Sequence, residues 1–268
     1  MKYTQLFILV LTIGLLTACG KELTTPIEAE KVAIVESYLY AGDSIITVKV
    51  SKMLPYSDDT SAAIEYISGL QLLVNGIAMT ETATGVYTLQ LGDKRIQPGE
   101  LYSMKFLYFS DTVTSTTIIP DKPVNFSISS GTVYADRMTS TGGMPGTPME
   151  DVALTWDNAD TSYYYVLIEY LETSFDYINS NMEDSDLSAV QGISPVSSSG
   201  TRLGMRNLYF FGSYRIILFK VNSDFADLYQ TATANSNNIT NPVTTINNGY
   251  GVFTGMASDT VYLEVVEN

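Results

Sequence analysis

Short runs rich in β-branched and aromatic residues, each followed by a turn signal, recur along the first half of the chain. The runs "VAIVESYLY" and "SIITVKVSK" flank the turn signal "AGD", and the run "LQLLVNG" ends at Asn75-Gly76, a pair favoured in tight hairpin turns. About seven strands at such even spacing are typical of two packed antiparallel sheets. The sequence therefore predicts an all-β fold, with a first β-sandwich domain over residues 31–119.

The second half continues the strand pattern after the segment "PDKP". Its two prolines predict a linker over residues 120–123, because proline cannot donate to a sheet ladder. Val152, Leu154 and Trp156 alternate toward one face of the next clear strand, and every second residue from Tyr164 to Tyr170 does so on the strand that follows. This pair resembles strands B and C of a fibronectin type III module, and implies a second immunoglobulin/fibronectin III-like sandwich over residues 124–268.

Two helical insertions are expected in this second domain. Apolar residues have helical spacing at Phe175, Ile178 and Met182, with Ser174 as the cap, and again over residues 223–232. The last run, "NNGYGVFTGMASDTVYLEVVE", predicts two strands joined by a turn.

The start of the chain has the features of an exported lipoprotein. An apolar stretch too short to span a bilayer is followed by Leu16, Thr17, Ala18 and Cys19, the only cysteine. This resembles the bacterial lipobox, which implies a signal peptide over residues 1–18 and a palmitate-containing lipid anchor on Cys19. Residues 19–30 are expected to tether the lipid to the first strand.

The charge and composition of the chain limit the partners it can bind and the kinds of catalytic or metal site it can form. The net charge of −15 excludes nucleic acid and anionic membrane surfaces as partners, because like charges repel. The chain has no histidine, which removes Ser-His-Asp triads and most zinc sites. We predict no catalytic residues, no cofactor and no metal site. Two alternatives stay open, a hydrolase that uses two carboxylates and a calcium site at Glu183, Asp184 and Asp186.

Surface functions are suggested by two further patterns. Tyr163, Tyr164 and Tyr165 run together, so at least one ring faces away from the core and could contact a glycan, although covering a half-buried sheet is the alternative. The triplets that begin at Asp43, Asp111 and Asp259 resemble O-glycosylation acceptors of Bacteroidota, which makes Ser44, Thr112 and Thr260 candidate sites. A turn followed by a strand produces the same triplet.

Several segments of the mature chain resemble lipoproteins of Bacteroidota that contain a domain of unknown function. They are "VAIVESYLYAGDSIITVKVSKMLPY", "LQLLVNGIAMTETATGVYTLQLGDKRIQPGELYSMKF" and "NPVTTINNGYGVFTG". The resemblance implies an outer-membrane, lipid-anchored binding or accessory protein that assists a TonB-dependent receptor in capturing a glycan or other nutrient. The side of the membrane stays open. The most specific residues are in the last segment: Asn241, Pro242, Asn248, Gly249, Gly251 and Phe253.

The last segment also predicts local structure. Residues 247–251 are expected to form a tight turn, with Phe253 packed into the second domain. The Asn-rich loop over residues 235–250 either connects strands or projects toward the receptor or a glycan.

A structural protein is the alternative function. Fimbrillins of the same bacteria are lipoproteins with two β-sandwich domains that polymerise by strand donation after cleavage at a basic residue. The first arginine here is Arg95, well inside the strand-rich half, although Lys49 and Lys52 are expected to follow early strands.

Overall fold

The computed structural model of the chain describes residues 31–53, 63–138, 149–183, 185–232 and 243–268. Predictions for Leu16–Cys19, Asp184, Asn241 and Pro242 fall outside these residues. Within them the strands are β1 (Ala33–Tyr40), β2 (Ile45–Lys52), β3 (Leu73–Val74), β4 (Ile77–Ala78), β5 (Thr80–Ala83), β6 (Val86–Gln90), β7 (Leu101–Tyr108), β8 (Asp111–Ile118), β9 (Ser127–Ile128), β10 (Thr132–Ala135), β11 (Val152–Thr155), β12 (Tyr163–Tyr170), β13 (Val190–Val196), β14 (Gly200–Leu203), β15 (Gly212–Val221) and β16 (Gly249–Glu267). The helical elements are the 3₁₀ turn η2 (Ser180–Met182) and the α-helix α2 (Ser223–Ala232).

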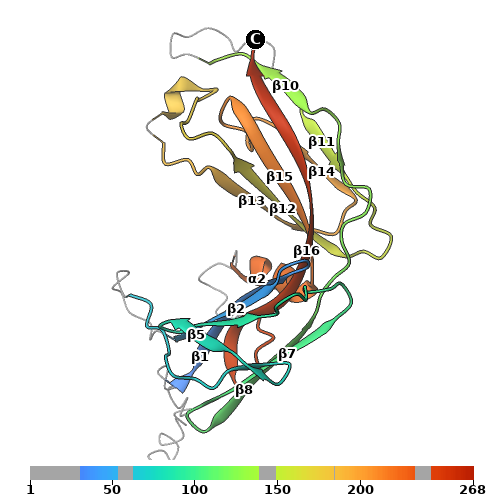
Figure 1. Cartoon of the computed structure of the whole chain (residues 1–268). Coiled ribbons are helices and arrows are strands. Elements are labelled where there is room, and N and C mark those ends of the chain that lie inside the picture. Colours follow the sequence, from blue (N-terminus) through green and yellow to red (C-terminus); the bar gives the residue numbers. More distant parts are fainter. Residues whose placement is uncertain (1–30, 54–62, 139–148, 184, 233–242) are drawn as a thin grey trace, which may run out of the picture.

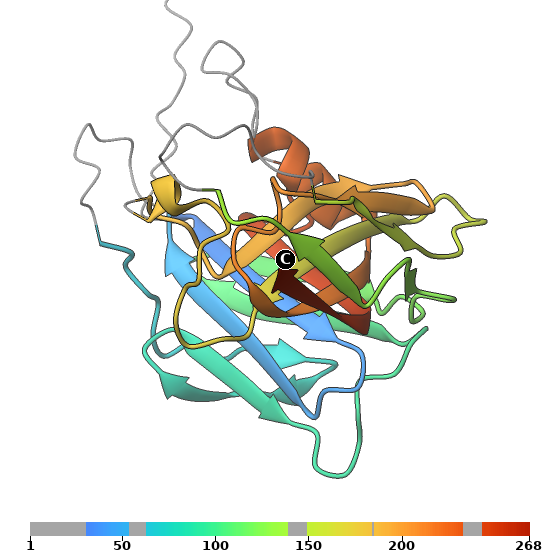
Figure 2. The same ribbon diagram turned by 90° about the horizontal axis from the view of Figure 1, so that it is seen from above.

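One nine-stranded sheet runs through the whole molecule. Its order is β13-β12-β15-β16-β1-β2-β6-β5, with β10 also paired to β16. Two smaller sheets, β4-β3-β7-β8 and β14-β11-β9, face its two ends. The result is a pair of sandwiches joined through one sheet (Figure 1), which confirms the predicted all-β class. Figure 2 views the molecule along its length, with the C-terminus toward the reader.

The first sandwich encloses its own core. Apolar residues alternate along β1 and β2, so that Val35 and Val48 face inward and meet Met104 and Phe106 of β7. Asn75-Gly76 forms the predicted hairpin turn between β3 and β4, with φ of 49° and 77°.

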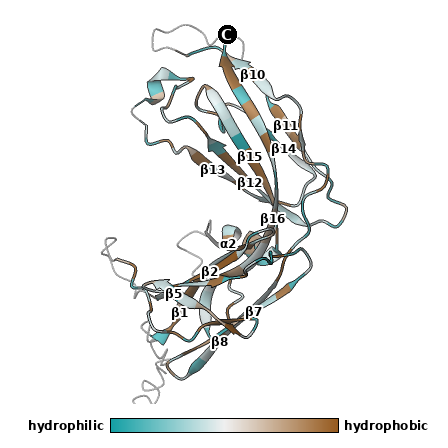
Figure 3. Cartoon of the chain, viewed as in Figure 1, coloured by the Kyte–Doolittle hydropathy of each residue, from teal (hydrophilic) through white to brown (hydrophobic). Residues whose placement is uncertain are grey.

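The second sandwich has the arrangement that the fibronectin resemblance implies. Strands β9, β11 and β14 form one layer, and β12, β13, β15 and the end of β16 form the other. Trp156 follows β11 and packs 5.4 Å from the ring of Tyr164 on β12. The hydroxyl of Tyr214 donates to the carbonyl oxygen of Phe210 and accepts from its N–H, both at 2.8 Å, the tyrosine corner of such folds. Hydrophobic and hydrophilic segments alternate along these strands (Figure 3).

Strand β16 belongs to both sandwiches. Its first part pairs in parallel with β1, from Gly249 opposite Ala33 to Met256 opposite Tyr40, and its second part pairs antiparallel with β15. The predicted turn within this run is therefore wrong. Asp259, which looked like a turn residue, sits opposite Leu218 in the ladder and its carboxylate lies 3.1 Å from Lys122 Nζ. The predicted division into two domains at residues 120–123 stays a prediction.

The two predicted helices had different outcomes. The helix over residues 223–232 is confirmed as α2. The helix over residues 174–182 is wrong except for η2, whose cap is Asn179 and not Ser174. Tyr177 instead forms a β-bridge with Phe210, and the Ile178 N–H donates to the carbonyl oxygen of Tyr209. Tertiary pairing has replaced local helical spacing here.

Candidate functional site

A row of aromatic side chains crosses the outer face of the large sheet where the two sandwiches meet. Tyr165 on β12 lies opposite Phe219 on β15, with ring centroids 6.3 Å apart. The Phe219 ring lies 5.8 Å from that of Tyr40 at the end of β1. We call Tyr40, Tyr165 and Phe219 the aromatic row. It faces away from both cores, because the alternating neighbours Tyr164 and Leu39 are the buried ones.

Helix α2 borders the aromatic row and leaves part of it open. The Phe225 ring of the helix packs 5.4 Å from Tyr165, and the Tyr229 ring packs at the same distance. Phe225 is 5% exposed, whereas Tyr40 is 37% exposed and Tyr165 and Phe219 are half-buried. Figure 1 shows α2 in the angle between the two sandwiches. The row is therefore an aromatic strip in that angle, with α2 along one side.

Two small residues make room for the rings. A Cβ atom on Gly192 of β13 would overlap the hydroxyl group of Tyr165, so the ring needs a glycine beneath it. Ser258 of β16 lies opposite Phe219, and its short side chain leaves space for Tyr40 to reach Phe219. The alternation of large rings and small residues keeps the rings in one line across neighbouring strands.

A polar network fixes α2 at the junction. The Asn222 amide donates to Thr117 Oγ1 and to the carbonyl oxygen of Ile118 at 3.0 Å, both at the end of β8. The buried Thr254 hydroxyl donates to Asp224 Oδ1 at 3.0 Å. Burial raises the pKa of the Asp224 carboxyl above its ordinary value. Since Thr117 and Thr254 belong to the first sandwich, these bonds hold α2 against it.

The phenols near the row stay protonated at neutral pH. Burial, followed by the charge of Glu36, raises the pKa of Tyr38 to about 12. Burial likewise raises the pKa of Tyr40, with smaller contributions from Asp43 and Glu36, and that of Tyr165. Each phenol can then both donate and accept a hydrogen bond. Flat rings with polar tips suit a ligand with an apolar face and hydroxyl groups, such as a pyranose sugar.

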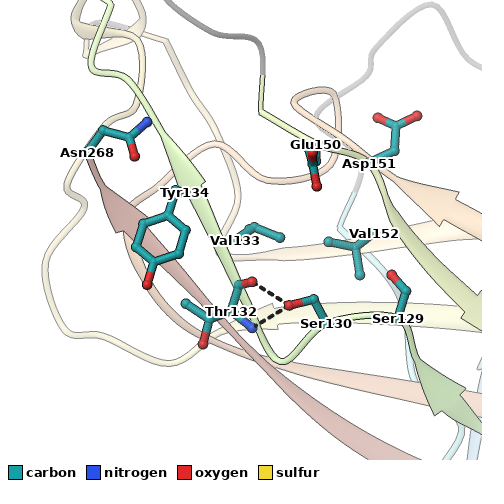
Figure 4. A pocket seen from close by; sticks show the side chains of 9 residues that line it. All are labelled: Ser129, Ser130, Thr132, Val133, Tyr134, Glu150, Asp151, Val152 and Asn268. Carbon is teal, nitrogen blue, oxygen red and sulfur yellow. Dashed lines mark hydrogen bonds between the residues drawn. The ribbon is translucent and has the colours of Figure 1, made fainter.

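A polar pocket lies at the far end of the second sandwich (Figure 4). Its volume is about 570 Å³, and residues from β10, the start of β11 and the C-terminal Asn268 line it. The hydroxyl of Ser130 already bonds the backbone of Thr132, and that of Ser129 accepts from the Ala153 N–H. The Asp151 carboxylate points away from the other labelled side chains. Both serine hydroxyls of this pocket are taken up by the backbone of the fold, so we prefer the aromatic row as the candidate site.

The tightest ionic cluster has a structural role. The Arg137 guanidinium bonds both carboxylate oxygens of Glu267 and of Asp176, at 2.6 to 3.2 Å, and lies 4.6 Å from the centre of the Phe211 ring. These contacts lower the pKa of the Glu267 carboxyl. Arg137 thus joins the ends of β10 and β16 to the loop before η2.

The residues of the last sequence motif close the first sandwich. Asn248 adopts a φ of 57°, and its amide donates to the carbonyl oxygen of Thr112 on β8 at 2.9 Å. Gly251 has a φ of 104° and approaches Val35 so closely that a Cβ would overlap the Val35 carbonyl oxygen. Gly249 does not have a positive φ, but a Cβ there would lie 2.9 Å from the Ala33 carbonyl oxygen.

Phe253 was predicted in the second domain, and this prediction is wrong. The ring is 0% exposed and belongs to the first core, together with Val35 and Ile246. The physical reason is the parallel pairing of β16 with β1, which places Phe253 opposite Ser37 on the inward face. Asn248, Gly249, Gly251 and Phe253 therefore act in the fold, and residues 243–249 lie against β8.

The candidate glycosylation residues lie in different settings. Ser44 precedes β2, Thr112 is the second residue of β8, and both are half-buried. Thr260 is exposed but lies in the middle of β16, where Asp259 begins no strand. Glycosylation of these residues stays a prediction.

Lys49 and Lys52 were expected after early strands, but both lie within β2.

In the described parts of the chain, no group of three carboxylate or thiol side chains is placed to hold a metal ion. Among the same residues, no helix is both long and apolar enough to cross a membrane.

Sequence reasoning found Tyr165 but missed the rest of the row. The run Tyr163–Tyr165 implied an outward ring, and the structure assigns that position to Tyr163 and Tyr165 while burying Tyr164. Tyr40 and Phe219 lie 179 positions apart in the sequence (219 − 40), and only the pairing of β15, β16 and β1 brings them together. The alternation "SYLY" in β1 was a usable signal, because it places two tyrosines on one face.

The solved structures to which the chain is similar include two of low sequence identity. The crystal structure of chicken CNTN1 FN1-FN3 domains is 15% identical with a TM-score of 0.24, and the match covers 87% of this chain and 65% of that chain. The crystal structure of DIP-gamma IG1+IG2 is 14% identical with a TM-score of 0.20, and covers 89% of this chain and 100% of that chain. A search of curated proteins finds no match.

A protein family matches nearly the whole sequence. The match runs over residues 21–261, which includes β1 to β15, α2 and most of β16. The chain therefore belongs to the family described as "Domain of unknown function (DUF4249)".

Proposed function

We propose that the protein is a lipid-anchored binding protein of the bacterial outer membrane, which captures a glycan nutrient at the aromatic row for a TonB-dependent receptor. The observation that carries this proposal is the row itself. The three rings lie side by side on the outer face of the sheet, with Tyr40 37% exposed and Tyr165 and Phe219 half-buried. The two tyrosines carry neutral phenols.

Two features of the sequence support the location and the partner. Leu16-Thr17-Ala18-Cys19 resembles a lipobox, and the late motif around Gly249 resembles lipoproteins of Bacteroidota encoded beside TonB-dependent receptors. Thr245 and Asn247 bond β8, an edge strand of the smaller sheet in the first sandwich. This edge is the surface where we would look for the receptor.

Replacing Tyr40 with alanine tests the capture site. We expect at least one linear oligosaccharide of glucose, xylose or mannose to bind the native protein in isothermal titration calorimetry. Tyr40→Ala and Tyr165→Ala should each weaken that binding by about tenfold or more, since a central aromatic contact contributes about 1.4 kcal/mol or more. The matched control is Tyr262→Ala, which removes an exposed tyrosine from the same sheet outside the row. Equal binding by Tyr40→Ala and the native protein would exclude the row.

Replacing Cys19 with alanine tests the anchor. The variant should leave the membrane fraction and lose radiolabelled palmitate, because Cys19 is the only thiol that can carry the lipid. Ser44→Ala, which changes a residue beside β2, is the matched control and should keep both properties. A Cys19→Ala protein that stays labelled in the membrane would show that the anchor is elsewhere.

A further inference from the structure

The hairpin between β7 and β8 ends in an unusual residue. Tyr108 pairs with Asp111, so the loop has only two residues, Phe109 and Ser110. Phe109 adopts a φ of 51°, a conformation that such loops usually reserve for glycine or asparagine. Its ring is nevertheless 60% exposed, and the neighbouring Leu107 is 61% exposed. The Phe109 ring packs edge-to-face on the ring of Tyr108, with centroids 4.7 Å apart. More than half of the Phe109 side chain is still open to solvent, which points to a role besides this contact.

The sheet surface beside this hairpin tip carries mainly hydroxyl groups, together with one lysine and three aliphatic side chains. Its outward residues are Leu101, Ser103, Lys105, Leu107, Thr112, Thr114, Thr116 and Ile118. The outward positions of β7 and β8, all of them described, carry no carboxylate, although the whole chain has 29 acidic residues. Asp111, exposed at the base of the hairpin, marks the limit of this surface. A groove of about 350 Å³ between residues 69–73 and β7 opens next to Leu107. The apolar part of this surface is the tip, with Phe109 and Leu107, and the leucine and phenylalanine side chains of the groove beside it.

The tip lies at the end of the molecule where the described chain begins. Thr112 lies three residues after Phe109, and its carbonyl oxygen accepts a hydrogen bond from the Asn248 amide. Gly249, which follows Asn248, pairs with Ala33 at the start of β1. Ile64 is 60% exposed and belongs to the same end, because the adjacent Glu65 bonds Lys52, which pairs with Ala33. This end is opposite to the C-terminus in Figure 1.

The position of the proposed lipid anchor indicates which end of the first sandwich lies nearer to the membrane. From Cys19 to Lys31 there are 31 − 19 = 12 residue steps. An extended chain spans at most about 3.5 Å per residue, so Lys31 lies within about 40 Å of the lipid. The tether therefore joins the described chain at the end of the first sandwich that carries Phe109, whereas Tyr40 of the aromatic row lies at the other end of β1.

We infer that the β7–β8 hairpin tip, with Phe109 and Leu107, inserts into the interface of the zwitterionic bilayer that carries the anchor. This inference rests on the lipid anchoring proposed above. Phe109 is apolar and sits at the tip, while Asp111 at the base keeps the insertion shallow. The contact sets the orientation, so that the aromatic row points away from the membrane.

Tryptophan fluorescence in vesicles tests the inference. The full lipidated chain with Phe109→Trp or Leu101→Trp is placed in phosphatidylcholine vesicles, with and without bromine on the acyl chains. Leu101 is a matched control, because it is 59% exposed and lies at the other end of β7, about 20 Å from the tip. The native Trp156 is 3% exposed in the second core and supplies a constant background.

The expected result separates the two positions. In vesicles, the emission of the tryptophan at position 109 should shift to shorter wavelength, and brominated acyl chains should quench most of it. The emission of the tryptophan at position 101 should stay unchanged. Palmitate labelling of the same samples distinguishes the failures. A labelled chain without quenching at position 109, or with equal quenching at both positions, overturns the inference and leaves the anchor intact. An unlabelled chain that does not sediment with vesicles overturns both the proposed lipid anchor and the inferred insertion of the hairpin tip. A concentration-dependent shift without vesicles would mean that a second copy covers the tip, which also overturns the inference.

A second variant checks that the ring is not needed for folding. Phe109→Gly replaces the strained residue with one that adopts positive φ freely, so the Tm should stay the same or rise. The same variant in lipidated form should be extracted more readily from vesicles by carbonate. A lower Tm for Phe109→Gly would show that the ring stabilises the fold, and the inference would be wrong.

Discussion

Gly251→Ala is expected to destabilise the protein more than alanine at any glycine whose surroundings are open. The φ of 104° is unfavourable for alanine, which costs about 1–3 kcal/mol. The added Cβ also overlaps the carbonyl oxygen of Val35, and moving the β1 backbone away costs a further amount of about 1–3 kcal/mol. The free energy of unfolding, measured by urea denaturation, reports the total.

A second glycine separates the two costs. Gly99 has a φ of 77°, and nothing lies within 4 Å of a Cβ placed there, so Gly99→Ala measures the conformational cost alone. The difference between the two variants is the cost of the close approach between β16 and β1. If both variants lose the same free energy of unfolding, β1 moves aside freely and the parallel pairing does not require glycine at position 251.

Phe253→Ala should lower the free energy of unfolding by about 3–5 kcal/mol, because the ring is fully buried in the first core and leaves a cavity. Tyr262→Ala is the control on the same strand. Its side chain is 63% exposed, so its effect should stay within about 0.5 kcal/mol. Equal effects of the two substitutions would show that Phe253 is not a core residue.

The same variant also tests how far the two sandwiches unfold together. Phe253 lies in the first core, whereas Trp156, the only tryptophan, lies in the second. Because β16 pairs with strands of both sandwiches, we expect Phe253→Ala to shift the urea midpoint of Trp156 fluorescence as well. An unchanged Trp156 transition would mean that the sandwiches unfold separately.

Local patterns in the sequence predicted the local structure. Alternating runs gave the strands, Asn75-Gly76 gave a hairpin, and the apolar face of residues 223–232 gave α2. The Trp156 and Tyr164 strands gave the layers of the second sandwich. Each of these features depends on residues that are near one another in the chain, where period and turn chemistry decide the outcome.

The remaining features depend on pairing between distant segments. Nothing near Asp259 shows that β16 continues, because its partner Leu218 lies 41 positions earlier (259 − 218). The same pairing moved Phe253 into the first core and assembled Tyr40 with Phe219. At residues 175–182, helical spacing lost to a bridge with Phe210. In each case tertiary contacts overrode the local signal.

The place of β16 in the sequence decides when the protein can fold. Both cores need residues 249–267, and these are made after all the other described strands. While the earlier segments emerge from the ribosome, β1 and β15 each lack the neighbour that lies between them. A chain with this topology remains open to chaperones until its last strand arrives, and both halves then close in a single late step.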